Sequence, residues 1–506
     1  MDIWQAFERT AEAYPGKEAI VEGTLRLTYR DLRELVERCA AGVQAAGAGP
    51  GGRVALIADT SLKHCVVTLA CQALHIMSVH VVPRLKPVEM AVFLNDAQPA
   101  LVLATVDLPE IELTALRLDD DASWSRLVRG EPPSRLPVPD EQALSNMMYT
   151  SGTTGRPKGV PLTHRQTYER VLAGTVHTGV CSRDRVLGAM PLFHQMGMIG
   201  NFLLAMVVGA TYYPVARMLP AVVLELIERE RLTAFFGSPT HWAMLAGDPS
   251  LRTRDLTSFR KGAYAGAPMR LDQLEFWNQR LDSELIHVYG TSETMWTLVN
   301  PDTRTRPEVT GRPGLHHWLR VAETGVGNPE ALVSDGEEGE LIVKVAGAGA
   351  SDECFGSYWR NPEGFAESVI DGWYFTGDSA RRDPSGDYTI TGRIKNIIRT
   401  GAEWVHPEEV ERVLATHPAV ADVAVVGVPD PVWGETVSAL VVTRTPVTHA
   451  EIDQFCRDHP QLAAYKRPRR VALVETIPRN VSGKLIRSEA VAILEVLQAQ
   501  SSPSAP

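Results

Sequence analysis

The feature that most constrains the fold of this chain is a series of short apolar segments that end in glycine-containing turns. They read RVLGAM at 185–190, LTAFFGS at 232–238, KGAYAGA at 261–267 and ELIHVYG at 284–290. Nearer the N-terminus, the strand signal RVALIAD at 53–59 lies between helical patterns at 31–46 and 63–74. This alternation predicts an α/β fold. Because ligands collect at the carboxyl ends of strands in open α/β sheets, we expect the turns to wall one common site.

Length and pattern together predict two main folding units. At roughly 100–200 residues per domain, 506 residues correspond to about three domains, or two if one is large. From about Lys395 the pattern changes to strand, helix, strand, strand, helix, strand, which is typical of a small α+β domain. We predict a large α/β unit at 1–394, with sheets, flanking helices and a small β-rich region. An α+β domain at 395–499 and a disordered tail at 500–506 would follow.

The charge balance disfavours a general nucleic-acid or anionic-membrane surface. Fifty Lys and Arg residues against 61 Asp and Glu residues leave a formal charge of −11, which repels polyanions. An anionic ligand would therefore need a local basic site. The six cysteines form no CxxC pair, so we expect reduced thiols without a disulfide or a zinc site.

Residues 196–216 challenge a water-soluble interpretation, because this stretch of 21 residues carries no charge. Three glycines, Asn201 and Pro214 interrupt it, so we predict a buried apolar helix and a strand, TYYPV. The N-terminus has neither the basic region nor the apolar region of a secretory signal. We expect a cytoplasmic protein without a membrane span, as a monomer or homodimer.

The stretch from Thr150 to Gly159, TSGTTGRPKG, is the densest chemical signal in the chain. Its glycines allow close approach of the backbone, and its hydroxyls and Lys158 supply donors to an anion. We predict that it holds phosphate. It is not a Walker A loop, because Pro157 precedes Lys158 and the Gly-Lys-[Ser/Thr] spacing is absent.

This loop is the first of seven ordered motifs. They are YTSGTTGRPKGV (149–160), PLFHQMG (191–197), YAGAP (264–268), YGTSET (289–294), GWYFTGD (372–378), GRIKNII (392–398) and PRNVSGKLIR (478–487). Together they resemble the adenylate-forming, or AMP-binding, superfamily of acyl- and aryl-CoA synthetases, luciferases and nonribosomal-peptide adenylation domains. The resemblance covers nearly the whole chain.

The resemblance implies an ATP-dependent carboxylic acid–CoA ligase. Such an enzyme joins a carboxylate to AMP, releases pyrophosphate, and then passes the acyl group from the adenylate to a thiol. The first step brings two anions together, so it needs positive charge and fixed donors at the α-phosphate. ATP, Mg²⁺ and CoA are the implied cofactors and co-substrates, with a small carboxylic acid as the partner and no nucleic acid.

The resemblance also implies where the nucleotide binds. The phosphates would lie on Thr150, Ser151, Gly152, Thr153, Thr154, Gly155 and Lys158, and the adenine beside Gly266, Ala267, Pro268, Tyr289, Gly290 and Thr291. Asp378 and Arg393 would contact the ribose hydroxyls. Glu293, which follows Ser292, offers a hard oxygen ligand suited to Mg²⁺.

In this interpretation one lysine acts in adenylation, and a second lysine is the hinge for the domain rotation between the two half-reactions. Lys484, in VSGKL, matches the family's catalytic lysine, a charge on a flexible stem that can reach both the carboxylate and the α-phosphate. Ser292 and Glu293 complete the implied catalytic set. Lys395, in GRIKN, matches the hinge about which the family rotates its small, mobile domain between the half-reactions.

The thiol site is where the sequence departs from the family. Gly401, Ala402 and Trp404 match the tunnel loop, but the usual Gly-Gly-Glu-Asn is replaced by Gly-Ala-Glu-Trp. Ala402 adds a methyl group and restricts φ, and Trp404 either narrows the tunnel or packs against its own domain. Lys466, in YKRPRR, is a candidate for the 3′-phosphate of CoA or an ordinary solvated cation.

The candidate acid pocket consists of His194, Met196, Phe236, Thr240, Tyr264 and Met295. Most of these side chains are apolar or aromatic, which predicts a hydrophobic monocarboxylic acid rather than a dicarboxylate or an amino acid. As an isolated histidine, His194 is also compatible with a purely structural place in the core.

Two other functions remain open at this stage. The first is a stand-alone adenylating enzyme that loads an acyl carrier protein. The segment PDPVWGETVSALVV at 429–442 resembles CoA ligases more than peptide-synthetase domains, and so favours CoA. The second is a non-catalytic nucleotide-binding homologue, against which the intact Lys484, Glu293, Asp378 and Arg393 argue.

Overall fold

The structure is a computed structural model that describes residues 1–110, 112–150, 158–281, 283–400, 403–430, 433–460, 462–480 and 484–501. The chain divides into two compact units. Unit 1 comprises Met1–Leu319 and Val343–Tyr374, and unit 2 comprises Arg320–Ile342 and Phe375–Pro506. Their sheets and helices confirm the predicted α/β class, and the predicted domain boundary at 394/395 stays a prediction.

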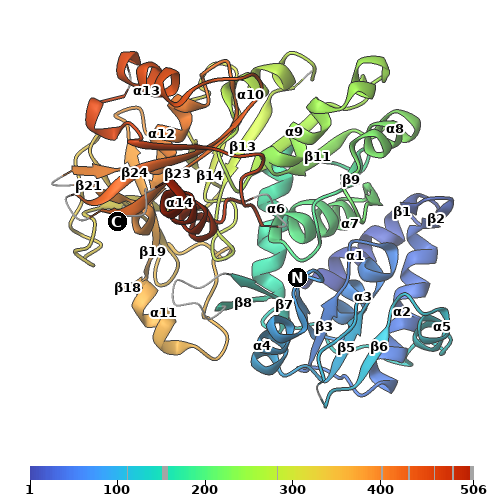
Figure 1. Cartoon of the computed structure of the whole chain (residues 1–506). Coiled ribbons are helices and arrows are strands. Elements are labelled where there is room, and N and C mark those ends of the chain that lie inside the picture. Colours follow the sequence, from blue (N-terminus) through green and yellow to red (C-terminus); the bar gives the residue numbers. More distant parts are fainter. Residues whose placement is uncertain are drawn as a thin grey trace. The chain divides into compact units, whose positions relative to one another are not determined.

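Unit 1 contains a nine-stranded sheet in the order β15-β14-β13-β12-β11-β9-β10-β1-β2 (Figure 1). Its strands are β1 (Glu18–Glu22), β2 (Leu25–Thr28), β9 (Arg185–Gly188), β10 (Thr211–Pro214), β11 (Ala234–Gly237), β12 (Lys261–Ala265), β13 (Leu285–Tyr289), β14 (Leu298–Asn300) and β15 (Arg312–Pro313). The six central strands are parallel. Phe236 packs in one hydrophobic cluster and its neighbour Phe235 in another, so both faces of the sheet are buried.

A six-stranded sheet in unit 1 has the order β6-β5-β3-β4-β7-β8. Its strands are β3 (Arg53–Ile57), β4 (Met77–His80), β5 (Leu101–Ala104), β6 (Ala115–Arg117), β7 (Leu144–Thr150) and β8 (Lys158–Thr163). Only β7 and β8 are antiparallel, and their pairing ends at Thr150 opposite Lys158. The two ends of the predicted phosphate loop are therefore adjacent.

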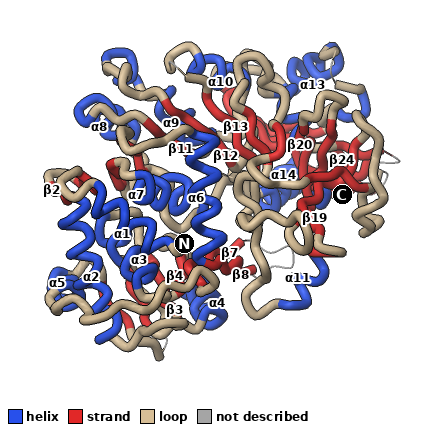
Figure 2. The backbone as a smooth tube through the Cα atoms, turned by 180° about the vertical axis from the view of Figure 1, so that it is seen from behind, coloured by secondary structure: helices blue, strands red, loops and turns tan. Residues whose placement is uncertain are grey.

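The helices of unit 1 cover these sheets. They are α1 (Ile3–Ala13), α2 (Tyr29–Ala45), α3 (Leu62–Ala73), α4 (Pro87–Ala97), α5 (Asp121–Val128), α6 (His164–Thr178), α7 (Leu204–Val208), α8 (Pro220–Glu230), α9 (Pro239–Gly247), α10 (Leu271–Asn278) and α11 (Pro362–Ser368), together with the π-helix η1 (Met196–Leu203) and the 3₁₀-helix η2 (Pro249–Thr253). The short strand β18 (Val369–Ile370) follows α11. A capping box of Thr163 and Gln166 starts α6 directly after β8. Helix α6 contacts β7 and β8 of the six-stranded sheet and β12 of the nine-stranded sheet, so it links the two sheets (Figure 2). It also contacts the helix η1.

The uncharged stretch at 196–216 is part of the core, as predicted. It forms η1, α7 and β10, and its side chains Met198 and Phe202 are fully buried. The helix begins with π-helical rather than α-helical turns. Among the described residues, no helix is long and apolar enough to cross a membrane.

The C-terminal part of unit 2 contains a sheet in the order β22-β21-β24-β23, with β25 beside β24. The strands that lie wholly in unit 2 are β20 (Tyr388–Arg393), β21 (Ile398–Thr400), β22 (Glu403–Val405), β23 (Val420–Asp430), β24 (Gly434–Thr443) and β25 (Arg470–Leu473). Its helices are α12 (Pro407–Leu414), α13 (His449–Asp458), α14 (Arg487–Ser501), η3 (Ile394–Asn396) and η4 (Ala464–Lys466). The unit boundary falls at or within β16 (Leu319–Ala322), β17 (Glu338–Lys344) and β19 (Trp373–Arg382).

Alternation along β23 explains why helices pack on both faces of this sheet. Val423 and Val425 belong to a cluster that includes residues of α12 and α13, whereas Ala424 and Val426 pack with residues of α14. After Lys395 the structure contains the predicted strands and helices, with β21 and β22 where one strand was predicted and with α14 added after β25. Helix α14 ends at Ser501, and residues 502–506 lie outside the described residues.

Candidate active site

The ends of the predicted phosphate loop lie on the β7–β8 hairpin. Thr150 ends β7, Lys158 starts β8, and the Thr150 hydroxyl lies 3.5 Å from the carbonyl oxygen of Lys158. The predicted phosphate ligands Ser151, Gly152, Thr153, Thr154 and Gly155 lie outside the described residues. The Lys158 ammonium lies over the ring of Tyr358, 4.7 Å from its centroid.

The predicted adenine residues meet at the carboxyl ends of two neighbouring parallel strands. Gly266, Ala267 and Pro268 are exposed and directly follow β12, whereas Tyr289 ends β13. The register pairs Ala265 with Val288, so the two segments leave the sheet side by side. Gly266 has a φ of +89°, a value that favours glycine at this turn.

The loop that carries Glu293 is a tight turn after β13. A side chain at Gly290 would lie 1.5 Å from the carbonyl oxygen of Met295, so only glycine fits there. The Thr291 hydroxyl accepts the Glu293 N–H at 3.2 Å, and the Thr291 carbonyl accepts the Met295 N–H at 2.9 Å. The turn therefore sets the direction of Glu293 through local backbone bonds.

A fully buried arginine holds this loop from α6. Arg170 donates to the carbonyl oxygens of Ser292 at 2.9 Å, Glu293 at 2.7 Å and Glu353 at 2.6 Å. Burial lowers the pKa of Arg170 to about 10, against the influence of the Glu353 carboxylate, so the guanidinium stays charged at neutral pH. Arg170 joins a loop on one sheet to the helix that follows the hairpin of the other.

The Glu293 carboxylate is buried but only partly occupied. Its Oε1 accepts the Tyr358 hydroxyl at 2.8 Å, and Oε2 has no hydrogen-bond or ion-pair partner among the described residues. Burial, with the nearby Glu293 charge, raises the pKa of Tyr358, which keeps the phenol protonated as a donor.

The donor chemistry around Glu293 fits Mg²⁺. The described residues contain no group of three or more His, Cys, Asp or Glu side chains that could hold a metal. Mg²⁺ does not need one, because it commonly binds one or two carboxylates together with substrate phosphates and water. The open Oε2 of Glu293 is the oxygen that could supply this contact.

The predicted acid-pocket residues do not all lie on one face of the nine-stranded sheet. Phe236 and Met295 pack in one cluster, with Met196 against it, whereas Tyr264 belongs to the cluster on the other face. There Tyr264 stacks on His287, with ring centroids 4.5 Å apart. Thr240 lies in α9, half-buried.

Asn201 and His194 complete the described part of this region. The Asn201 amide donates to the carbonyl oxygens of Met196 at 3.0 Å and Phe236 at 2.9 Å, and so ties η1 to the end of β11. Burial, with His241 nearby, lowers the pKa of His194 to about 4. His194 is therefore a neutral imidazole at neutral pH, with its Nε2 buried and without a hydrogen bond in the described structure.

In unit 2, the predicted ribose residues face each other across a strand pair. Asp378 on β19 pairs in register with Arg393 on β20, and Arg393 Nε lies 2.6 Å from Asp378 Oδ1. The Arg393 guanidinium also donates to the Thr376 carbonyl at 3.1 Å. Asp378 is 3 % exposed, so its buried charge lies beside an opposite charge that offsets part of the cost of desolvation.

The two predicted functional lysines lie close to this pair within unit 2. Desolvation first, and then Arg393 and Lys395, lower the pKa of Lys484, whereas Asp378 acts in the opposite direction. Desolvation and Arg393 likewise lower the pKa of Lys395. Both side chains are exposed. Four residues predicted from three motifs thus gather here, with more positive than negative charge.

The structure places only part of the predicted CoA site. Gly401 and Ala402 lie outside the described residues, and Trp404 is placed on β22 only by its backbone. The Lys466 ammonium is occupied by both carboxylate oxygens of Glu409, at 2.7 and 2.8 Å. Among the residues not predicted, Arg469 lies 4.0 Å from the ring centroid of Trp433, and both side chains are exposed.

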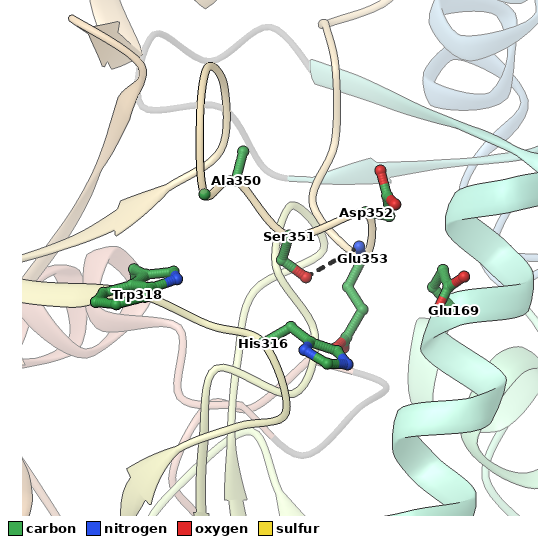
Figure 3. Close-up of a pocket in the computed structure, with 8 residues that line it drawn as sticks. Glu169, His316, Trp318, Ala350, Ser351, Asp352 and Glu353 are labelled. Atoms are coloured by element: carbon green, nitrogen blue, oxygen red, sulfur yellow. Dashed lines mark hydrogen bonds between the residues drawn. The ribbon is translucent and has the colours of Figure 1, made fainter.

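A separate pocket of about 430 Å³ in unit 1 contains none of the predicted site residues. It is lined by Glu169, His316, Trp318, Gly349, Ala350, Ser351, Asp352 and Glu353. Figure 3 shows Trp318 on one side and Glu169 and Asp352 on the other. The buried Glu353 carboxylate lies 3.5 Å from His317 Nε2, so a neighbouring side chain already faces its charge.

Sequence reasoning missed Arg170 and Tyr358. Arg170 lies on the buried face of α6, but that face also carries the polar His164 and Thr167, so no clear apolar stripe marked it in the sequence. Tyr358 had no signal either, because its contacts with Lys158 and Glu293 span long distances in sequence.

Comparisons with known proteins agree with the motifs. The AMP-binding enzyme family matches residues 7–350, and the AMP-binding enzyme C-terminal domain matches residues 409–484. A 4-chlorobenzoate–CoA ligase of Arthrobacter sp is 36 % identical over 500 residues, with 94 % of this chain and 92 % of the relative covered. A feruloyl-CoA synthase of Amycolatopsis sp is 33 % identical, with 95 % and 96 % covered.

A solved structure of similar length supports the same relationship. The ATP-bound structure of MatB from Rhodopseudomonas palustris aligns with a TM-score of 0.87 and 25 % identity, covering 99 % of this chain and 100 % of MatB. The resemblance predicted from the seven motifs is confirmed. The chain belongs to the AMP-binding, adenylate-forming enzyme superfamily, in its acyl- and aryl-CoA ligase branch.

Proposed function

We propose that the protein is an AMP-forming carboxylic acid–CoA ligase. The observation that carries this conclusion is the gathering of Lys484, Lys395 and Arg393 around Asp378 in unit 2. These side chains come from three separate motifs, and their charges suit a nucleotide that carries both ribose hydroxyls and phosphate. Membership of the CoA-ligase branch supports the same reaction.

The first half-reaction forms an acyl-adenylate. A carboxylate oxygen attacks the α-phosphorus of ATP, the bond to the β-phosphate oxygen breaks, and pyrophosphate leaves. Lys484 offsets the negative charge that builds up at the α-phosphate. Desolvation first, and then the cations Arg393 and Lys395, lower its pKa, and these neighbouring cations add to the attraction of an arriving anion.

Each part of the nucleotide has its own support in the structure. Lys158, with residues 150–155, would hold the β- and γ-phosphates, and the edge formed by Gly266 and Tyr289 would border the adenine. Asp378, oriented by Arg393, presents an acceptor for the ribose hydroxyls. Mg²⁺ on Glu293 would neutralise phosphate charge when bound.

The second half-reaction transfers the acyl group to the thiol of CoA. The thiol sulfur attacks the acyl carbon, the anhydride bond breaks, AMP leaves, and the thiol proton passes to solvent. Lys395 is the proposed hinge, and Gly401, Ala402 and Trp404 the proposed tunnel loop. For the nucleotide end of CoA, the exposed Trp433–Arg469 pair offers a flat face and a cation, whereas Lys466 is occupied by Glu409.

The acid is a hydrophobic monocarboxylic acid, and aryl acids are the first candidates. Neutral His194 with Met196, Phe236 and Met295 gives an apolar lining without a fixed cation for a second carboxylate. The similar proteins named for 4-chlorobenzoate and ferulate act on compounds of this kind, which supports the choice.

A screen of acid-dependent ATP–pyrophosphate exchange tests this proposal. Aliphatic, aryl and polycyclic monocarboxylic acids are each supplied with ATP and Mg²⁺, and the active acids are then combined with CoA or with an acyl carrier protein. We expect exchange with aryl acids and acylation of CoA. Acylation of the carrier alone would instead identify a carrier-loading enzyme, and exchange with none of the acids would indicate a non-catalytic homologue.

A further inference from the structure

A short segment of unit 1, residues 353–359, runs between the Glu293 loop and strand β8. Its backbone is fixed at both ends: the Phe355 N–H donates to the Glu293 carbonyl at 2.9 Å, and the Trp359 N–H donates to the Gly159 carbonyl at 2.8 Å. The Gln166 amide also donates to the Cys354 carbonyl at 2.7 Å. The position of Tyr358 is therefore set by the two elements that it lies between.

Tyr358 contacts a predicted functional residue on each side. Its hydroxyl donates to Glu293 Oε1 at 2.8 Å, and its ring carries the Lys158 ammonium 4.7 Å from the centroid. The ring packs against Phe355, with centroids 5.0 Å apart, and is 4 % exposed. One rigid side chain thus separates a cation of the phosphate loop from the carboxylate on the opposite loop.

We propose that Tyr358 is a positioning residue for the adenylation step, which holds the Glu293 carboxylate toward the metal and the Lys158 ammonium toward the phosphates. This inference rests on the proposed function. It goes beyond that function because none of the seven motifs contains Tyr358 or its segment.

The physical argument starts from the freedom that these two side chains would otherwise have. A glutamate carboxylate rotates about its last bond, and a lysine has four flexible carbons. The hydroxyl occupies Oε1 and leaves Oε2 for a cation, and because the donor is neutral it does not cancel the charge that attracts the metal. Partners behind a metal ligand commonly contribute about ten- to a hundred-fold to metal affinity or activity.

The ring has a separate effect on Lys158. The face of a buried aromatic ring attracts the ammonium without neutralising it, so the charge remains available to phosphate oxygens. Removing only the hydroxyl should leave the contact between the ring and the Lys158 ammonium in place. The two contacts of Tyr358 can therefore be separated by substitution.

The test compares Tyr358→Phe with the wild-type protein by calorimetric titration of ATP without any acid, in excess Mg²⁺ and in excess EDTA. We expect the gain in ATP affinity from Mg²⁺ to fall by about ten-fold in Tyr358→Phe. Affinity in EDTA should be unchanged, because the ring beneath Lys158 is retained. Tyr29→Phe is the matched control: it removes another buried tyrosine hydroxyl, bonded to the Ala205 and Ala210 carbonyls, and should keep the full Mg²⁺ gain.

A double-mutant cycle keeps the inference falsifiable if Tyr358→Phe lowers stability. Glu293→Gln preserves the shape of the side chain and removes its charge, so it should itself abolish most of the Mg²⁺ gain. Adding Tyr358→Phe to Glu293→Gln should then cost nothing further. Equal losses in both backgrounds, or a full Mg²⁺ gain in Tyr358→Phe, would overturn the positioning role.

The proposed function is tested independently by acid-dependent pyrophosphate exchange of the wild-type protein. Exchange in the wild type together with an unaltered Mg²⁺ gain in Tyr358→Phe refutes only the inference. Absence of exchange with every acid refutes the proposed function itself, whatever the ATP titrations give.

Discussion

Two buried carboxylates, one in each unit, are stabilised in different ways. Glu293 in unit 1 is 5 % exposed and accepts a neutral phenol, whereas Asp378 in unit 2 is 3 % exposed and pairs with the Arg393 guanidinium at 2.6 Å. A neutral donor orients a carboxylate but leaves its charge available to a cation. A guanidinium cancels that charge and leaves a well-oriented acceptor, which suits sugar hydroxyls.

The cations differ between the units in a corresponding way. Lys158 in unit 1 lies over an aromatic ring, whereas Lys484 in unit 2 is exposed among other cations. Repulsion among cations in unit 2 is relieved when an anion arrives, which suits a group that must act on a phosphate during the reaction. In this comparison Lys158 is held by a neutral ring, whereas Lys484 is influenced by neighbouring charges.

The largest expected effect comes from removing the unit 2 cation that has the most direct role. Lys484→Ala should reduce acid-dependent pyrophosphate exchange by at least about 3 kcal/mol, or more than a hundred-fold, because the developing charge at the α-phosphate loses its stabiliser. Thioester formation from supplied acyl-adenylate should persist. Arg412→Ala, which removes an exposed cation of α12, is the control, and normal exchange in Lys484→Ala would refute the assigned role.

Removing the buried cation of unit 1 should act on stability. Arg170→Met leaves the carbonyls of Ser292, Glu293 and Glu353 without this donor, which should lower the free energy of unfolding by about 3 kcal/mol. Denaturant unfolding measures the loss. Arg165→Met, one turn earlier on α6 and exposed in part, should cost less than about 1 kcal/mol. Equal losses would mean that the three carbonyl bonds contribute little.

The two carboxylates can be compared directly through ATP binding. Asp378→Asn should weaken ATP binding by about ten-fold both in Mg²⁺ and in EDTA, because a carboxylate acceptor for the ribose hydroxyls is lost. Glu293→Gln should weaken it only in Mg²⁺. If Asp378→Asn also acted only in Mg²⁺, the proposed division between a sugar acceptor and a metal ligand would be wrong.

A smaller effect distinguishes two cations of unit 2 in CoA binding. Arg469→Gln should raise the KM for CoA about two- to five-fold, since an exposed cation–π pair contributes roughly 0.5–1 kcal/mol. Lys466→Gln should change it less, because the Lys466 ammonium is already bound to Glu409. Steady-state kinetics at saturating acid and ATP checks this, and the reverse order would restore Lys466 as the phosphate contact.

The smallest expected effect is a pH dependence that is absent. Because burial lowers the pKa of His194 to about 4, the imidazole is neutral above about pH 5 and gains a proton only as the pH falls through 4. The KM for the acid should therefore show no His194 ionisation between about pH 6 and 8. A transition near the usual histidine pKa of 6.5 that disappears in His194→Gln would contradict this.

Local signals predicted the elements better than they predicted the contacts. Apolar patterns placed β23 and the buried segment 196–216 close to where they lie, because those signals act over a few residues. Tyr264 was grouped with Phe236 as pocket lining, yet the sheet puts these side chains on opposite faces. Their strands are neighbours, and a difference of one residue in the strand register decides which face of the sheet a side chain occupies.

The sequence by itself determined the fold class and the family, and it supplied the charged residues that we propose for the nucleotide site. Those properties follow from local pattern and residue chemistry. Only the tertiary structure decided how each charge is held: Arg170 on three carbonyls, Tyr358 between Lys158 and Glu293, and Arg393 on Asp378. These contacts join segments tens to hundreds of residues apart, so they depend on the packing of the sheets, which no local pattern specifies.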